Sequence, residues 1–276
     1  TSIMVSSNAV AVASEGGALM GLSLPGALRF VGAGQGRFLP MNDAPVAPLV
    51  TTRHDEDVAV IEFDDGKANA LGHDAIEAIL GAFDEVEDAG AVVLAGRPER
   101  FSAGFDLKVM AAGPDAARGL LRRGVDLFLR MYLYPRPVVA ACTGHALAAG
   151  AILLMCSDLR IGSRGDYRIG LPEVTIGMSL PVFATELARD RISKRHYTRA
   201  TALGTIYGPE GACDAGFLDE VVEARRTVET AVEQAGTLTG IGKAELAATR
   251  ISARSAVADT IRQSLDGDLG RFSVES

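Results

Sequence analysis

The order of apolar and polar residues along the chain predicts strands and helices that alternate. Residues 57–63, DVAVIEF, alternate between the two types, as in a strand buried on one face only. Residues 73–87 repeat apolar side chains at the spacing of an amphipathic helix, at Ile76, Ile79, Leu80 and Phe83. Residues 91–95, AVVLA, are apolar throughout, which is typical of a strand covered on both faces. Strand, helix and strand in this order indicate an α/β fold with a covered sheet.

The same pattern continues along the rest of the chain. A helix is predicted over residues 116–132, a buried strand over 138–142, a loop over 143–147 and a small-residue helix over 148–156. Shorter strand signals follow at residues 159–162 and 167–169, and helical patterns dominate from Phe183 onward. No low-complexity stretch interrupts residues 45–276, so we expect one α/β core with a helical C-terminal region.

The first forty residues differ from the rest in composition. Their charged side chains are few, namely Glu15, Arg29 and Arg37. Pro25 and several glycines break the apolar stretch within them, and no basic segment precedes it, so the pattern favours neither a secretory signal nor a membrane span. Residues 32–36, GAGQG, lack the spacing of a dinucleotide-binding loop, and Pro40 lies where its helix would run. We expect residues 1–40 to be a non-native or disordered extension, with Met41 as the native start.

Composition and charge restrict the class of protein. The chain has 276 residues, of which 48% are apolar and 22% charged, and its formal net charge is −8. An acidic chain of this kind is a poor match for a nucleic-acid-binding protein. Three widely spaced cysteines indicate a reducing compartment, and we predict the cytoplasm. The histidines lack metal-ligand spacing, so no metal site is expected; they are His54, His73, His145 and His196.

Two loops combine small residues with the start of a helix. Residues 100–107, RFSAGFDL, follow a predicted buried strand, and Asp106 suits the N-cap of the next helix. Residues 144–150, GHALAAG, also follow a buried strand and open a helix. Helix N-termini present unpaired N–H groups that stabilise a developing negative charge on an oxygen atom. Either loop alone is equally compatible with close packing of a helix on a sheet.

Taken together, these loops resemble the enoyl-CoA hydratase/isomerase (crotonase) superfamily. The matching strings are FSAGFDL, PVVAACTGHALAAG from Pro137, CSDLR from Cys156, LPEV from Leu171, and AGFLDEV from Ala215. The resemblance runs from about Asp57 to the C-terminus, with order and spacing kept. It implies an α/β fold, a crotonase-like spiral of ββα units with a helical C-terminal trimerisation region. The expected domain covers residues 41–276, with the spiral at about 50–200 and the helical region at about 201–276.

The resemblance also implies acyl-coenzyme A thioesters as substrates, bound by a homotrimer or hexamer. Two backbone N–H groups hold the thioester oxygen, and on this sequence we place them at Ala103 and Ala149. The substrate-binding residues expected from the same match are Lys67, Ala68, Ala70, Ser102, Phe105, Lys108, His145, Gly150 and Ile152. We expect no cofactor, since coenzyme A is part of the substrate, and neither nucleic acid nor membrane as a partner.

The carboxylates separate the reactions known in this family. Its hydratases use two glutamates, and on this chain the position of the first is Ile152, whereas the second is present as Glu173. The apolar neighbours of Glu173 predict a raised pKa and an acid or base that works near neutral pH. One carboxylate suits proton transfer from C2 to C4, so we expect a Δ3-Δ2-enoyl-CoA isomerase. A 2-enoyl-CoA hydratase of the fatty acid β-oxidation type, with another acid such as Glu186, and a non-catalytic acyl-CoA binding protein remain alternatives.

Overall fold

The computed structural model describes residues 3–6, 9–12 and 47–271. The contacts divide the chain into two units, residues 1–47 and residues 48–276. In the first unit, β1 (Ile3–Ser6) and β2 (Ala9–Val12) form an antiparallel pair. The predictions for residues 13–40 and for Met41 lie outside the described residues.

A six-stranded sheet forms the base of the second unit. Its order is β13-β11-β9-β6-β4-β3, and every neighbouring pair is parallel except β3 with β4. The strands are β3 (Val50–Asp55), β4 (Val58–Phe63), β6 (Ala91–Gly96), β9 (Val138–Cys142), β11 (Leu159–Ser163) and β13 (Glu220–Val222). The predicted strands at residues 57–63, 91–95 and 138–142 are confirmed in position as β4, β6 and β9. The prediction that the first is buried on one face only is wrong, because β4 contributes to the cores on both sides of the sheet.

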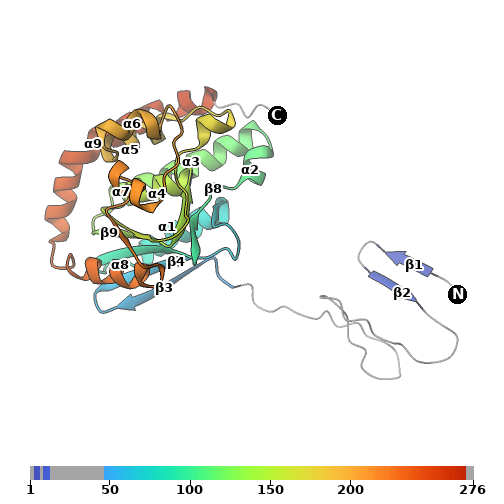
Figure 1. Cartoon of the computed structure of the whole chain (residues 1–276), viewed down its shortest axis with the longest axis horizontal. Helices are drawn as coiled ribbons and strands as arrows, with labels where there is room; N and C mark the ends of the chain where they lie inside the picture. The colour runs from blue at the N-terminus through green and yellow to red at the C-terminus, as the bar shows by residue number, and fades with distance from the viewer. Residues whose placement is uncertain (1–2, 7–8, 13–46, 272–276) are drawn as a thin grey trace, which may run out of the picture. The chain divides into compact units, whose positions relative to one another are not determined.

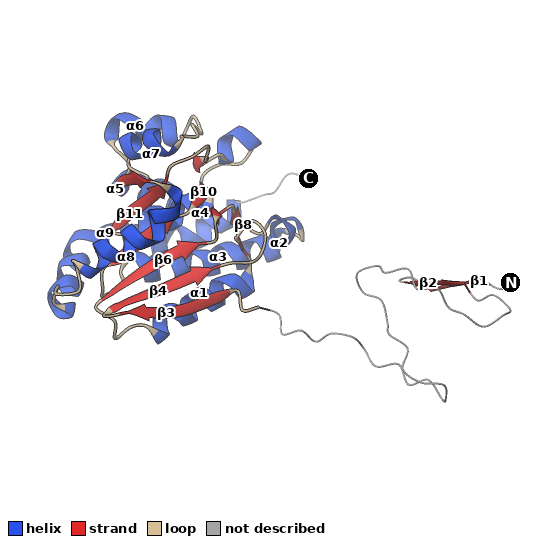
Figure 2. Cartoon of the chain, turned by 60° about the horizontal axis from the view of Figure 1, so that its bottom comes forward, coloured by secondary structure: helices blue, strands red, loops and turns tan. Residues whose placement is uncertain are grey.

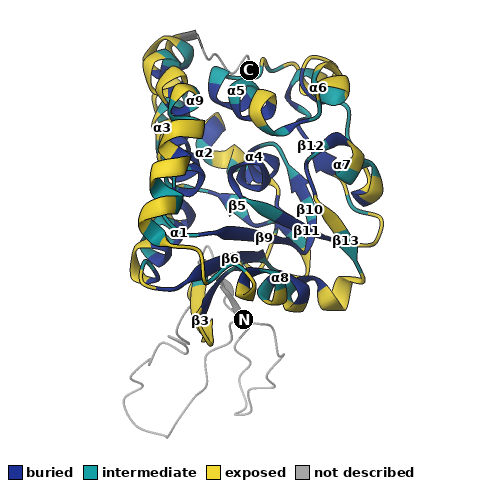
Figure 3. Cartoon of the chain, turned by 90° about the vertical axis from the view of Figure 1, so that its left-hand side faces the viewer, coloured by how far each residue is buried: buried dark blue, intermediate teal, exposed yellow. Residues whose placement is uncertain are grey.

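Both faces of the central part of this sheet are covered, which explains why β6 and β9 are apolar throughout, whereas the edge strand β3 is largely exposed. Alternate residues face two separate cores, so Ile61 and Leu94 belong to the larger core and Val60 and Val93 to the smaller one. Helices α1 (His73–Glu85), α3 (Pro114–Tyr132) and α4 (Ala149–Cys156) lie on the larger side, whereas α8 (Thr227–Gly236) covers the smaller side (Figure 3). All eight residues of α4 are buried.

The remaining helices surround this core (Figures 1 and 2). They are α2 (Leu107–Ala111), α5 (Val182–Arg191), α6 (Lys194–Ala200), α7 (Pro209–Ala215) and α9 (Lys243–Arg271). The expected helical region after Phe183 is therefore present, interrupted by the short strand β13. None of the helices in the described ranges has the length and hydropathy needed to cross a bilayer.

A second, smaller sheet consists of three parallel strands in the order β12-β10-β7. They are β7 (Glu99–Ser102), β10 (Gly144–Leu147) and β12 (Ile169–Gly170), and beside them β5 (Ala70–Leu71) pairs in parallel with β8 (Gly104–Phe105). The prediction of a loop at residues 143–147 is wrong, because β10 occupies most of it. The sequence GHAL has weak strand character, and its extended form depends on partners on both edges.

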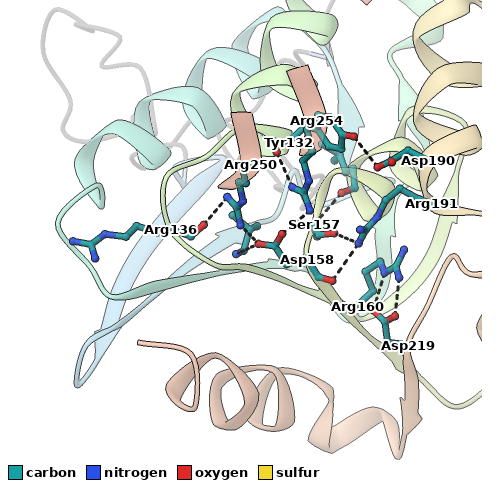
Figure 4. A network of polar contacts seen from close by, with 12 residues as sticks. Tyr132, Arg136, Ser157, Asp158, Arg160, Asp190, Arg191, Asp219, Arg250 and Arg254 are labelled. Atoms are coloured by element: carbon teal, nitrogen blue, oxygen red, sulfur yellow. Dashed lines mark hydrogen bonds and ion pairs between the residues drawn. The ribbon is translucent and has the colours of Figure 1, made fainter. Parts of the chain in front are cut away.

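Helix α9 is held to its own chain by a partly buried polar network (Figure 4). The Asp158 carboxylate accepts hydrogen bonds from the Val138 N–H at 2.8 Å and from the guanidinium of Arg254 at 2.9 Å, and it also pairs with Arg250. Arg254 donates in addition to the Tyr132 carbonyl at 2.7 Å. Both arginines come from α9, so Asp158, which lies between α4 and β11, ties this helix to the start of β9.

Replacing Asp158 tests this attachment. Asp158→Asn leaves the Arg250 guanidinium buried, with 5% of its side chain exposed, and without a compensating charge. We expect the free energy of unfolding to fall by about 3 kcal/mol, as measured by urea titration. Asp259→Asn, which breaks an exposed pair with Arg262, is the control and is expected to change stability by less than about 0.5 kcal/mol. Equal losses in the two variants would contradict the assigned role of Asp158.

Candidate active site

The three strands of the small sheet end at the same edge. Leu147 of β10 lies opposite Gly170 of β12, and Ala146 lies opposite Ser102 of β7. Because the strands are parallel, the segments that follow them leave from neighbouring points at their carboxyl ends. These segments begin at residues 103, 148 and 171, and they lead to the three residues predicted to be catalytic.

The segment after β10 turns sharply into α4. Ala148 has a φ of 52°, in the left-handed region, and its N–H donates to the Gly170 carbonyl at 3.0 Å. The Ala148 carbonyl accepts from the N–H groups of Ala151 and Ile152, which starts the helix. The N–H groups of Ala149 and Gly150 precede the first helical hydrogen bonds and have no acceptor within α4. They carry the positive end of the helix dipole into a buried position.

The segment after β7 corrects one sequence-based prediction. The Ala103 N–H donates to the Ala68 carbonyl at 3.0 Å, so it is not available to a thioester oxygen, and Ala103 is wrong as a predicted donor. The Asp106 N–H donates to the Leu71 carbonyl at 3.1 Å, toward β5. Successive N–H groups of an extended strand point in opposite directions, so the Phe105 N–H points away from β5. The pairing of β5 with β8, which the sequence does not reveal, decides between these two amides.

Glycines bring the two loops into contact. A Cβ atom on Gly104, which has a φ of 96°, would lie 2.9 Å from the Cβ of Ala148 and 3.2 Å from the Ala149 nitrogen. A Cβ atom on Gly150 would lie 2.3 Å from the Ser102 carbonyl oxygen. Neither position accommodates a side chain without movement of the backbone. Phe105 follows Gly104 directly, and its amide is thereby placed beside that of Ala149.

Glu173 supplies a carboxyl group at the end of the third strand. It begins the short helix η1 (Glu173–Ile176), and only 9% of its surface is exposed. Its Oε2 atom is buried and has no hydrogen-bond partner among the described residues. Burial raises the pKa of this carboxyl group to about 7, and a hydrogen bond from its own backbone opposes part of that shift. The raised pKa predicted from its apolar neighbours agrees with this arrangement.

The position of the first family glutamate is apolar in the structure as well as in the sequence. Ile152 lies on α4, three residues after Ala149, with 2% of its surface exposed, and it packs in the larger core. Glu186, considered as a substitute acid, lies on α5 and pairs with Arg189 at 3.3 Å. It is already occupied by that ion pair, whereas the Oε2 atom of Glu173 has no partner.

The loop that carries Lys67, Ala68 and Ala70 is fixed by two residues that the sequence analysis did not single out. The Asp65 carboxylate accepts from the N–H groups of Lys67, Asn69 and Ala70 at 2.7 to 3.0 Å. The Asn69 side chain, fully buried, donates to the carbonyls of Phe63, Arg100 and Phe101. Asn69 also has a φ of 53°, in the left-handed region. The only sign of this turn in the sequence is the Asp65-Gly66 pair that precedes it.

The predicted substrate-binding residues fall into two groups. Lys67, on the loop before β5, and Lys108, in α2, are exposed and have no ion pair in the described part of the chain. Ser102 instead supports the loop, because its hydroxyl donates to the Asn69 carbonyl at 2.7 Å and accepts from the Gly104 N–H. His145 is not brought to the site. It faces away from α4 and contacts Tyr167, with ring centroids 5.4 Å apart.

Comparison with known proteins supports the same family as the sequence. The profile of the family described as "Enoyl-CoA hydratase/isomerase" matches residues 53–274. Human mitochondrial enoyl-CoA delta isomerase 1 is 27% identical over 221 residues, which cover 78% of this chain and 73% of that protein. A probable enoyl-CoA hydratase of Bacillus subtilis is 36% identical over 135 residues, which cover 47% of this chain and 52% of that protein.

Solved structures agree in the fold. The apo structure of an enoyl-CoA isomerase from Mycobacterium tuberculosis is 38% identical, with a TM-score of 0.78 over 82% of this chain and 100% of that one. The structure of human mitochondrial Δ3-Δ2-enoyl-CoA isomerase is 27% identical, with a TM-score of 0.77 over 81% of this chain and 90% of that one. The names of these relatives include both isomerases and hydratases, so they do not separate the two reactions.

The buried Glu173 carboxyl group predicts a pH-dependent stability. Its pKa in the folded protein, about 7, lies above the ordinary value of 4.5, so its burial is tolerated when the group is protonated and destabilises the fold once it ionises. Glu173→Gln should therefore be more stable than the wild type at pH 8, by up to about 3 kcal/mol, with the difference vanishing by pH 4. Urea unfolding at both pH values measures this. The exposed Glu85→Gln is the control, and a gain independent of pH would contradict the burial of a free carboxyl group.

Proposed function

Because the chain belongs to the enoyl-CoA hydratase/isomerase family, we propose that it moves the double bond of an enoyl-CoA thioester from the Δ3 to the Δ2 position. The observation that carries this proposal is the single buried carboxyl group at the meeting point of the strand ends. The Oε2 atom of Glu173 has no hydrogen-bond partner among the described residues, and Ile152 occupies the place where a second carboxylate would lie.

The two loops supply the electrostatic part of the reaction. Removal of a proton next to the thioester carbonyl places negative charge on its oxygen, which then has the character of an enolate. The N–H groups of Phe105 and Ala149 are the donors that we assign to this oxygen. One well-placed donor in a dry site lowers the barrier by about 2.7–4 kcal/mol. The N-terminus of α4 adds the favourable field of its dipole.

Glu173 carries the proton between the two carbon atoms. As a carboxylate it takes a proton from C2. The electron pair of the broken C–H bond then forms an enolate that is conjugated with the double bond between C3 and C4. The resulting carboxylic acid then returns the proton to C4, and the double bond forms between C2 and C3. A pKa near 7 keeps both forms of Glu173 accessible at neutral pH, which such a two-way transfer requires.

Lys67 and Lys108 are proposed to attract the phosphate groups of coenzyme A. Both residues are exposed, Lys67 on the loop before β5 and Lys108 in α2, which follows the Phe105 donor, and the chain as a whole carries a net charge of −8. Local cations are therefore needed to offset the repulsion between the acidic protein and a polyanionic substrate. The homotrimer or hexamer and the cytoplasmic location stay predictions from the sequence.

Two other functions remain to be tested against this one. A hydratase has to activate a water and also protonate the adjacent carbon, and Ile152 offers no group for the second task. A buried carboxyl group without a partner lowers the stability of the folded protein when it ionises. A protein that only binds acyl-CoA has no need of such a group. A strongly perturbed carboxyl group of this kind is more typical of a catalytic site.

Replacing Glu173 separates catalysis from binding. Glu173→Gln keeps the shape of the side chain but removes the base, so isomerisation of a 3-enoyl-CoA should slow by at least about 10²-fold, while the affinity for coenzyme A is retained. In the wild type, kcat/KM should fall below pH 7 as the free enzyme's base becomes protonated. Absorbance of the conjugated product measures both effects. Unaltered turnover in the variant would favour the non-catalytic protein.

Ile152 tests the choice between isomerase and hydratase. The wild type should hydrate a 2-enoyl-CoA slowly, whereas Ile152→Glu places a second carboxyl group one turn into α4. We expect the hydration rate of this variant to rise by about 10²-fold, the contribution of one positioned acid or base. Ile152→Gln is the matched control for the loss of apolar packing. Fast hydration by the wild type, or no difference between the folded Glu and Gln variants, would overturn this assignment.

A further inference from the structure

A row of basic side chains crosses the outer face of the small sheet, away from α4. His145 of β10 lies opposite Arg100 of β7, and the Arg168 N–H on the other side donates to the His145 Nδ1 atom at 3.0 Å. The next residues, Phe101, Ala146 and Ile169, are buried in the larger core, so the row points to the opposite face. The strands β7 and β10, together with the residue that precedes β12, therefore place these side chains next to one another.

The row has no counter-charge in direct contact. No carboxylate lies within ion-pair distance of Arg100 or Arg168 in the described ranges, and the Arg100 side chain donates to the Glu99 backbone carbonyl at 3.0 Å. Glu99 and Asp166 are the acidic groups whose charges act on His145, and the two arginines act on it more strongly. Like charges that face each other on adjacent strands destabilise a sheet. An anion bound between the two arginines would reduce this repulsion.

His145 is arranged to donate a hydrogen bond outward. Its Nδ1 atom accepts from the Arg168 backbone, so in the neutral imidazole the proton resides on Nε2. Burial and the two arginines lower the pKa of His145, which keeps it in this neutral form. The cluster thus offers two guanidinium groups and one N–H donor, the groups that bind the oxygens of phosphate.

A hollow of about 600 Å³ adjoins the row. Tyr167 lines the hollow and also packs edge-on against His145, with ring centroids 5.4 Å apart, so it connects the two. Its lining includes Arg97 and Arg225 as well as three acidic residues, Glu62, Asp64 and Glu99, and a cavity of this size accommodates a small organic molecule. Arg97 is paired with Asp64, whereas Arg225 has no ion pair in the described ranges.

We propose that Arg100, His145 and Arg168 bind the phosphate group of a phosphorylated small molecule, whose organic part enters the hollow beside Tyr167. This site lies on the face of the sheet opposite α4 and is separate from the proposed thioester site. Neither Glu173 nor Ala149 lines it.

Calorimetric titration at constant ionic strength tests the proposal with two probes, inorganic phosphate and phenyl phosphate. Phenyl phosphate should bind at least about tenfold more tightly, since its ring reaches the hollow, and inorganic phosphate should compete with it. Arg100→Gln and Arg168→Gln should each weaken both probes by about tenfold or more. His145→Phe, which removes the donor, should weaken them more than His145→Gln. The exposed Arg195→Gln, which lies on α6, is the control and should leave both affinities unchanged.

Several outcomes would overturn the proposal. These are absence of phosphate binding, equal affinities for the two probes, or no effect of the Arg100 and Arg168 substitutions. If phosphate does not bind, and the Arg100 and Arg168 variants differ from the wild type in oligomeric mass, the row would instead be assigned to contact with another copy of the chain. The KM for an enoyl-CoA should be unchanged in these variants. A parallel rise in that KM would assign the row to coenzyme A. The calorimetric measurements of phosphate binding do not depend on whether the isomerase activity itself is found.

Discussion

The parallel pairing of β7, β10 and β12 is the constraint on which the rest of the site depends. These strands are only two to four residues long, yet their register fixes where three separate segments of the chain leave the sheet. A shift of one residue would turn Ala146 and Ile169 out of the core. At Gly104 and Gly150 the two loops approach so closely that neither position has room for a side chain. Backbone geometry, more than side-chain chemistry, therefore underlies the proposed donor pair.

The buried charges of this protein follow two opposite rules. Asp158 is surrounded by arginines and a backbone N–H, and its ionised form stabilises the position of α9. Glu173 is buried more deeply than Asp158, with 9% of its surface exposed, but its Oε2 atom has no hydrogen-bond partner among the described residues. The first arrangement suits a structural role, and the second leaves a carboxyl group that changes protonation near neutral pH. A cost in stability at a single residue is what a proton-transfer site is expected to show.

The sequence predicted the long, strongly apolar elements well, because burial on both faces of the large sheet imposes an unbroken apolar pattern. It also located both loops and Glu173, through small residues and a family resemblance. The predictions from the sequence were wrong where contacts between residues distant in the chain determine the local structure. The strand β10 depends on its two partners, and the choice of Phe105 over Ala103 depends on the pairing of β5 with β8. The contact of Asp158 with Arg250 joins residues 92 positions apart, with no local signal.

The most direct test of the account is a crystal structure with an unreactive enoyl-CoA analogue bound. The account predicts the thioester oxygen within about 3.1 Å of both the Phe105 and the Ala149 nitrogen atoms. It also predicts that a Glu173 carboxyl oxygen faces the carbons on either side of the migrating double bond. A thioester oxygen held elsewhere, or a Glu173 side chain turned away from those carbons, would contradict the central claim.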